Sequence, residues 1–316
     1  DSSLKLTRFD DYWGNAPKLE TINFKFITES SQAMIELETG NADLVLDVPA
    51  LSYESIESSS DFKLLKFDSV VGDYIHFNCS KPPFDDVRVR QAVAYAINQA
   101  DIRRAVYLDQ ADILFSAITP AIFGYIDEFE GDNWPYEYDN ANIEKAKELL
   151  AEAGYPDGFT VDFLIDDNSD RVAVAEVVKN QLEAVGIHTN LSSMDYASWY
   201  QKLVAGEVDI FLNGINAQTG EPDRCMYLRW HSNCIEPGTN MTKYSNPEFD
   251  ELLTRARTTY DDQEKLECYA EAQRLWVEEL PSIPYIVRNH IYASKSNLQG
   301  LRAYGEACFL FDVYFE

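Results

Sequence analysis

The sequence lacks the features that define several large protein classes. No stretch approaches the roughly 18 consecutive apolar residues of a transmembrane helix, so no such span is predicted. Lys and Arg total 26 against 54 for Asp and Glu, which gives a net charge of −28. A field of that sign repels the phosphates of nucleic acids and anionic lipids. Binding to nucleic acid or to a membrane surface is therefore not expected.

Cysteine, histidine and catalytic motifs are also scarce. The five cysteines include no C-x-x-C pair and the four histidines are widely separated, so no resident metal site or dithiol redox site is predicted. The motifs G-x-S-x-G, H-E-x-x-H, Walker A and G-x-G-x-x-G are missing. Acidic pairs such as Asp166-Asp167 are interpreted as solvated surface, because acids are so common in this chain. The sequence indicates a protein without catalysis and without a cofactor.

One pair of cysteines is close enough in sequence to suggest a disulfide. Cys225 and Cys234 stand nine positions apart in a segment rich in turn residues. Closing so short a loop stabilises a fold by roughly 3 kcal/mol in the chain-entropy model. The alternative is two free thiols, which is also the interpretation of the other three cysteines.

The chain contains enough apolar residues to form the cores of more than one lobe. Its 316 residues are 46% hydrophobic and 13% aromatic, which is typical of a globular protein with two domains or one large domain. Strand and helix patterns alternate almost throughout, so an α/β fold is expected. The signals for a strand at 22–26, a helix at 30–40 and a strand at 43–47 predict a βαβ unit with parallel strands. A second such unit is predicted from 159 to 191.

Two consecutive prolines suggest where the first lobe ends. Pro82 and Pro83 cannot continue a strand or a helix, and an amphipathic helix is predicted from Val87 to Ala105. We therefore expect residues 1–85 to form part of a first lobe that residues of about 287–316 complete. Residues 86–286 are expected to form the second lobe.

Four strings in this order carry a family resemblance. They are DYWG at 11–14, KPPFDDVRVRQA at 81–92, AKELLAEAGY at 146–155 and YSNPEFD at 244–250. Together they resemble the extracytoplasmic solute-binding proteins of ABC transporters, in the peptide, dipeptide and nickel class (family 5). The resemblance extends from about residue 5 to the C-terminus. It implies a periplasmic-binding-protein-like bilobal clamshell of mixed sheets flanked by helices, which traps a ligand between its lobes.

The resemblance also suggests that part of the family's structure is missing here. Members of the family usually have further strands and a small extra domain ahead of the DYWG string, whereas this chain starts just before it. We expect a truncated chain, by design or by nature, which carries no targeting signal of its own.

The resemblance directs attention to the segment 209–223 and to the residues around it. Asn216 lies in this segment, and Gln218 stands where peptide binders of the family carry an aspartate for the α-amino group of the ligand. The neutral amide argues against a peptide with a charged N-terminus. Tyr74 and Tyr196 match positions that contact ligand in relatives, with packing in the core as the alternative.

Three further candidates complete the predicted ligand-binding set. Arg171 stands near a position that meets a peptide carboxylate in some relatives; an ion pair with Asp170 or Glu176 is the alternative. Trp230 and His231 lie in the irregular, polar segment 214–245, where they could stack on a ligand or help to hold a chelated metal. A single histidine does not define a metal site.

The resemblance implies a solute-binding component of an ABC importer, which delivers peptide-like solutes to membrane permease subunits. On this interpretation the protein is monomeric and lies in the periplasm or on the cell surface as a lipoprotein. Two alternatives remain open: binding of a nickel chelate or an oligosaccharide on the same scaffold, and an unrecognised hydrolase.

Overall fold

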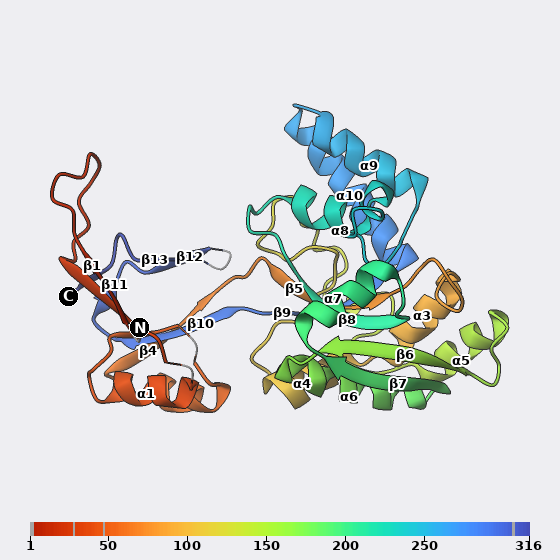
Figure 1. The fold of residues 1–316 in the computed structure, drawn as a ribbon, viewed down its shortest axis with the longest axis horizontal. Helices are drawn as coiled ribbons and strands as arrows, with labels where there is room; N and C mark the ends of the chain where they lie inside the picture. Colours follow the sequence, from red (N-terminus) through yellow and green to blue (C-terminus); the bar gives the residue numbers. More distant parts are fainter. Residues whose placement is uncertain (1–2, 28, 47, 305–306) are drawn as a thin grey trace. The chain divides into compact units, whose positions relative to one another are not determined.

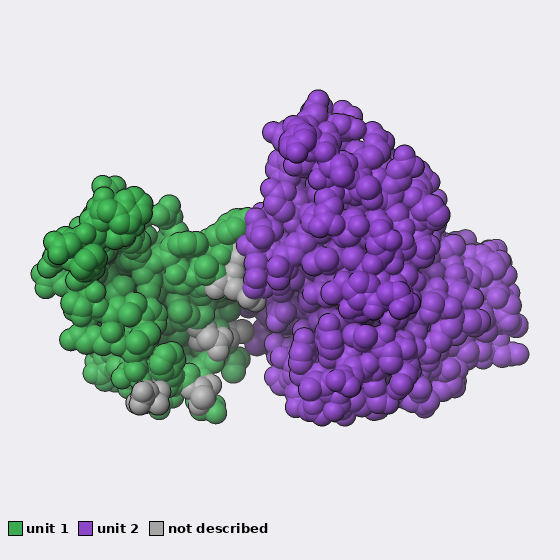
Figure 2. All heavy atoms as spheres, turned by 45° about the horizontal axis from the view of Figure 1, so that its top comes forward, with its two compact units in different colours: residues 1–69, 289–316 green, residues 70–288 purple. Residues whose placement is uncertain are grey.

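The computed structural model describes residues 3–27, 29–46, 48–304 and 307–316, and it divides into two compact units (Figures 1 and 2). Unit 1 contains the residues up to Ser69 and those from Asn289 onward, and unit 2 contains Val70–Arg288. The chain thus crosses between units at 69/70 rather than near residue 85. The reason is that the strand Val71–Phe77 pairs along its length with strands of unit 2.

Unit 1 is built from short antiparallel pairings. β1 (Ser3–Thr7) pairs with β2 (Thr21–Lys25), and β10 (His290–Lys295) lies between β3 (Leu44–Val45) and β4 (Phe62–Phe67), antiparallel to both. The first predicted βαβ unit is therefore wrong, because the partner of β3 comes from the other end of the chain. The remaining α-helices and strands of unit 1 are α1 (Ser30–Glu38), α2 (Tyr53–Glu57), β11 (Leu298–Gln299), β12 (Arg302–Tyr304), β13 (Ala307–Phe309) and β14 (Tyr314–Phe315).

Unit 2 is organised around one mixed sheet of five strands in the order β7-β6-β8-β5-β9. Its strands are β5 (Val71–Phe77), β6 (Phe159–Asp166), β7 (Ile187–Met194), β8 (Ile210–Asn216) and β9 (Ser282–Val287). β6 is parallel to β7 and β8, whereas β5 is antiparallel to β8 and β9. The second predicted βαβ unit is confirmed, since α6 (Ser169–Glu183) connects β6 to the parallel β7.

Helices cover the sheet of unit 2, as expected for an α/β fold (Figure 1). They are α3 (Val87–Ala96), α4 (Gln99–Tyr107), α5 (Ile143–Glu152), α6, α7 (Tyr196–Ala205), α8 (Leu228–Trp230), α9 (Pro247–Thr258) and α10 (Asp262–Glu279). The single helix predicted for 87–105 is two helices. The chain is extended at Ile97 and Asn98, and the Asn98 side chain caps α4 by accepting from the Asp101 N–H at 3.0 Å.

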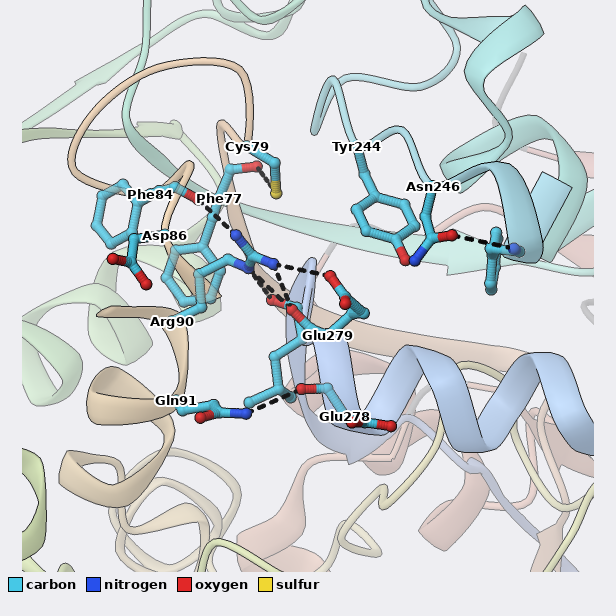
Figure 3. A network of polar contacts seen from close by, with 12 residues as sticks. Phe77, Cys79, Phe84, Asp86, Arg90, Gln91, Tyr244, Asn246, Glu278 and Glu279 are labelled. Atoms are coloured by element: carbon cyan, nitrogen blue, oxygen red, sulfur yellow. Dashed lines mark hydrogen bonds and ion pairs between the residues drawn. The ribbon is translucent and has the colours of Figure 1, made fainter. Parts of the chain in front are cut away.

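Within the string at 81–92, Arg90 has a structural role. It is only 3% exposed. Its guanidinium donates to the carbonyls of Phe84 at 2.7 Å, Glu279 at 2.7 and 2.9 Å and Leu280 at 3.1 Å (Figure 3). These carbonyls belong to the loop before α3 and to the end of α10. Arg90 thus joins two segments that are far apart in sequence and satisfies carbonyls that a helix end leaves free.

Within the described residues, no helix combines the length and the apolar character needed to cross a membrane.

Candidate ligand-binding site

Polar side chains gather at one edge of the unit 2 sheet. Because β6 and β8 are parallel, their carboxyl ends lie at the same edge. β5 runs against β8 and β9 runs against β5, so the beginning of β5 and the end of β9 lie there too. In α/β folds, ligands bind outside the carboxyl ends of such strands. This edge is therefore the candidate site.

An ion pair between a buried carboxylate and an exposed arginine lies at this edge. Asp73 is 2% exposed and its Oδ2 lies 2.5 Å from Nε of Arg288, the residue that follows β9. Burial raises the pKa of Asp73, and the positive charges of Arg288 and Arg171 partly oppose that rise. The carboxylate is thus held among cations but shielded from water.

Gly214 has no side chain, and the charged groups of Asp73, Arg288 and Arg171 lie close to the position that a Cβ would take. It is the cross-strand partner of Asp73. A Cβ at this position would lie 2.6 Å from Nη2 of Arg288, 2.7 Å from Oδ1 of Asp73 and 3.6 Å from Nη2 of Arg171. Any side chain here would displace the ion pair. The absence of a side chain lets both guanidinium groups approach the same point of the backbone.

Arg171 is fixed by the end of β6 and by the start of α6. Its Nη1 forms an ion pair with Oδ2 of Asp166, the last residue of β6. Asn168 caps α6, since its side chain accepts from the N–H groups of Asp170 and Arg171, both at 3.1 Å. The sequence suggests Asp170 or Glu176 as the ion-pair partner of Arg171, but the partner in the structure is Asp166.

Asp166 itself overturns a sequence interpretation. The pair Asp166-Asp167 was assigned to solvated surface, yet Asp166 is 5% exposed while Asp167 is exposed. The correction has a physical reason: the neighbouring guanidinium of Arg171 compensates a charge that would otherwise have to stay in water.

Two of the predicted aromatic contacts belong to the hydrophobic core. Tyr74 is 1% exposed and its hydroxyl donates to the Ala117 carbonyl at 2.9 Å. Trp230 is fully buried, packs edge-on against Tyr74 with ring centroids 5.8 Å apart, and donates from Nε1 to the Ser282 hydroxyl at 3.2 Å. Neither ring presents accessible surface to a solute in this structure.

His231 is likewise held by the protein. Its Nδ1 accepts from the Asn233 N–H at 3.0 Å and lies 3.5 Å from Oδ1 of Asp250, and its Nε2 lies 3.2 Å from the Thr254 hydroxyl. Burial lowers the pKa of His231, with the charge of Asp250 opposing. Across the described ranges, no three His, Cys, Asp or Glu side chains are grouped as a metal site.

Two of the predicted residues are exposed to a solute, and a third is half-buried. Tyr196 begins α7 and is 58% exposed, and Gln218 is exposed in the turn after β8. That turn is anchored by the N–H of Ala217, which donates to the Val70 carbonyl at 3.2 Å. Asn216 is half-buried, and its Oδ1 has no hydrogen-bond partner among the described residues. Tyr196 and Gln218 thus present polar groups at the surface, whereas the Oδ1 of Asn216 is shielded from solvent.

The predicted disulfide is not formed. Cys225 and Cys234 are both free and buried. The thiol of Cys225 donates to the Pro222 carbonyl at 3.2 Å, within the π-helix Asp223–Tyr227 and the residue that precedes it. Burial raises the pKa of Cys225 to about 12. Because the sulfur is directed toward its own helix backbone, spacing in the sequence was a poor guide to pairing.

Comparison with known proteins shows which family this chain belongs to. Residues 1–236 match the family model described as bacterial extracellular solute-binding proteins, family 5 Middle. The chain belongs to this family. The α/β fold of mixed sheets flanked by helices is thereby confirmed as the family's own.

Individual family 5 relatives agree with this assignment. The glutathione-binding protein GsiB of Salmonella paratyphi A is 31% identical over 98% of this chain and 60% of its own length. Heme-binding protein A of Haemophilus influenzae is 29% identical over 90% of this chain and 51% of its own length. The chain thus spans little more than half of the length of these curated relatives.

Solved family 5 structures superpose over the entire chain. HbpA2 from Haemophilus parasuis has a TM-score of 0.89 at 24% identity, covering 100% of this chain and 62% of that one. DppA from Helicobacter pylori, in complex with the peptide STSA, has a TM-score of 0.81 at 26% identity, covering 100% of this chain and 61% of that one.

The sequence analysis did not identify the ion pair between Asp73 and Arg288. Asp73 stands between Gly72 and Tyr74 in an otherwise apolar buried strand, and a charge in such a strand is a usable signal. Arg288 carried no comparable signal, because it directly follows an apolar strand at a position where a solvated arginine is common.

Proposed function

We propose that this protein is the solute-binding component of an ABC importer, which captures peptide-like solutes outside the cytoplasm and delivers them to permease subunits without chemical conversion. The observation that carries the proposal is the family 5 match over residues 1–236. The relatives named for glutathione and for a bound peptide support a solute of peptide character.

The candidate site supplies the chemistry that such a solute needs. Tyr196 offers an exposed aromatic face with a hydroxyl, and Gln218 and Asn216 offer amide groups that donate and accept hydrogen bonds. The ion pairs Asp73–Arg288 and Asp166–Arg171 place further charged groups at the same edge of the sheet. Preorganised polar groups beside an aromatic face favour binding because little side-chain freedom remains to be lost.

Gln218 is the residue that selects among peptide-like solutes in this proposal. An aspartate at this position would pair with a free ammonium group, whereas the amide pairs with a neutral donor or acceptor. A solute whose amino group is blocked or engaged elsewhere fits the neutral side chain better than a free N-terminus does.

The test uses the full-length protein. Native mass spectrometry identifies the solute that co-purifies with it, and calorimetry compares free-amino peptides with the same peptides after N-acetylation. Gln218→Asp should weaken binding of the native solute by about 1 kcal/mol, the scale of one lost hydrogen bond, and should favour free-amino peptides. Gln110→Asp adds the same charge at another exposed glutamine of unit 2 and serves as the matched control.

Two results would contradict the proposal. Failure of the folded full-length protein to bind any co-purified or added solute would remove the binding role. Conversion of a bound solute into a product would make the protein an enzyme. Tighter binding of the native solute by Gln218→Asp would instead show that the solute carries a positive charge at this contact.

A further inference from the structure

Unit 2 has a surface cavity of about 480 Å³ apart from the ion pairs at the sheet edge, whose residues do not line it. Several segments form its wall. They are the turn that contains Thr219, the π-helix Asp223–Tyr227, the end of α9 and the beginning of α10. π-helices are rare and occur frequently at functional sites. This cavity is therefore a second candidate ligand site.

Three cations line the cavity: Arg224, Arg257 and Lys265. Arg257 is held by the protein, since its Nε lies 3.3 Å from Oδ1 of Asp223 and its guanidinium lies over the ring of Tyr227, 4.2 Å from the ring centroid. Arg224 and Lys265 have no carboxylate at ion-pair distance within the described residues. Acids outnumber bases by 54 to 26 in this chain, so two unpaired cations in one cavity are unexpected.

Two hydroxyl-bearing residues add neutral hydrogen-bond donors to the same cavity. Tyr269 lines it, is only 2% exposed, and has a hydroxyl without a hydrogen-bond partner in the described part of the chain. A tyrosine hydroxyl in so buried a residue normally has a partner. Burial raises the pKa of Tyr269, so the hydroxyl keeps its proton and can donate. The second residue is Thr219, which is exposed. Unpartnered donors beside cations indicate a missing acceptor.

Two acids also line the cavity, and they do not cancel its positive charge. Asp223 is already paired with Arg257. Glu221 is exposed, so water and salt screen its carboxylate. The lining thus has three bases against two acids, whereas the whole chain has a net charge of −28. The charge of the cavity is opposite in sign to that of the chain and favours an anion.

We propose that this cavity binds a phosphate dianion, either free phosphate or the phosphate group of a monoester. A monoester carries about −1.5 to −2 charges at pH 7 and presents three acceptor oxygens. The guanidinium of Arg224 can contact two of these oxygens, the ammonium of Lys265 acts as a point charge, and the Tyr269 hydroxyl donates to an oxygen. A carboxylate has a single charge and would leave one of the two cations unpaired. This second ligand does not depend on the proposed function.

The experiment uses the full-length protein without added solute. Calorimetry at about pH 7.5 and constant ionic strength measures binding of inorganic phosphate, methyl phosphate and acetate. At least one of the two phosphates should bind about tenfold or more tightly than acetate, because the charge-assisted contacts of a second cation are lost with a monoanion. Arg224→Met and Tyr269→Phe should each weaken phosphate binding about fivefold or more. Glu221→Gln should tighten it about twofold, since it removes a negative charge from the lining.

Lys179→Met is the matched control for Lys265→Met. Lys179 is a partly buried lysine of α6, outside the cavity and also without a carboxylate partner among the residues that the structure describes. Both substitutions remove one positive charge, so they change the net charge of the chain equally. Lys265→Met should weaken phosphate binding about fivefold or more, and Lys179→Met should stay within about twofold of wild type. Thermal unfolding without ligand identifies any variant that does not fold, and Tyr269→Phe and Glu221→Gln preserve the shape of the side chain.

The outcomes are separate from those of the proposed function. Failure of both phosphates to bind, or binding no tighter than that of acetate, would overturn the inference. Equal losses in Lys265→Met and Lys179→Met would overturn it too, because only the overall charge would then matter, and so would weaker binding by Glu221→Gln. Binding of one phosphate but not the other supports the site and assigns it to free phosphate or to monoesters. None of these results affects whether a solute co-purifies with the protein.

Discussion

The carboxylate of Asp73 is paired with the guanidinium of Arg288 at a separation of 2.5 Å, at the place where the chain leaves unit 2. The backbone N–H of Arg288 also donates to the Val71 carbonyl at 3.2 Å. The first and last strands of unit 2 are thus tied by a main-chain bond and by an ion pair at the same edge.

Asp73 should give the protein a distinct pH dependence. Its folded pKa is raised, so the folded state holds this proton more firmly than the unfolded state does, and the associated stability is present at low pH and lost as pH rises through the folded pKa. We expect the stability of wild type to decline relative to that of Asp73→Asn, which cannot lose a proton, as the pH rises through that window. Urea unfolding of both proteins between pH 3 and about pH 7 measures the difference. A stability difference that does not change with pH would contradict the prediction.

His76 should change the pH dependence of stability in the opposite direction from Asp73. Burial lowers its pKa to about 3, and its Nε2 donates to the Asn213 carbonyl at 3.3 Å. The unfolded state takes up a proton below about pH 6.5 but the folded state does not, so stability falls by up to about 1.4 kcal/mol per pH unit between these values. His76→Gln should lack this component, while the exposed His188→Gln should retain it. Equal slopes for wild type and His76→Gln would refute the assignment.

Arg90 should contribute much more to stability than Arg88, its neighbour on α3. Arg90→Met leaves the carbonyls of Phe84, Glu279 and Leu280 without their donor in a buried place, and we expect the free energy of unfolding to fall by about 3 kcal/mol. Arg88 is solvent-exposed, so Arg88→Met should cause a smaller loss. Chemical denaturation of the two variants decides between them, and equal losses would contradict the network in Figure 3.

The cysteines should all titrate as thiols. Five free thiols are expected after unfolding without reductant, since each cysteine is free in the structure. In the folded protein Cys225 should react very slowly, because it is buried and its pKa is raised to about 12. Counting labelled sites by mass spectrometry before and after unfolding tests both statements. A count of three labelled thiols in the unfolded protein, with Cys225 and Cys234 unlabelled, would show that these two cysteines form the disulfide.

Local patterns were informative where neighbours in sequence are neighbours in space. The unit from β6 through α6 to β7 was predicted correctly, because its parallel strands are joined by the helix that covers them. The break between α3 and α4 was missed although Asn98 is a typical helix cap, since the apolar stripe continues through Ile97 and Ile102.

The sequence by itself determined the family, the α/β class and most of the helices and strands of unit 2, since those depend on local periodicity, caps and short strings. Only the tertiary structure decided that β3 pairs with β10, that Asp73 meets Arg288, and that Tyr74 is buried while Gln218 is exposed. The physical reason is that burial and charge compensation depend on what distant segments bring to a position. No pattern within a few residues of that position records those distant partners.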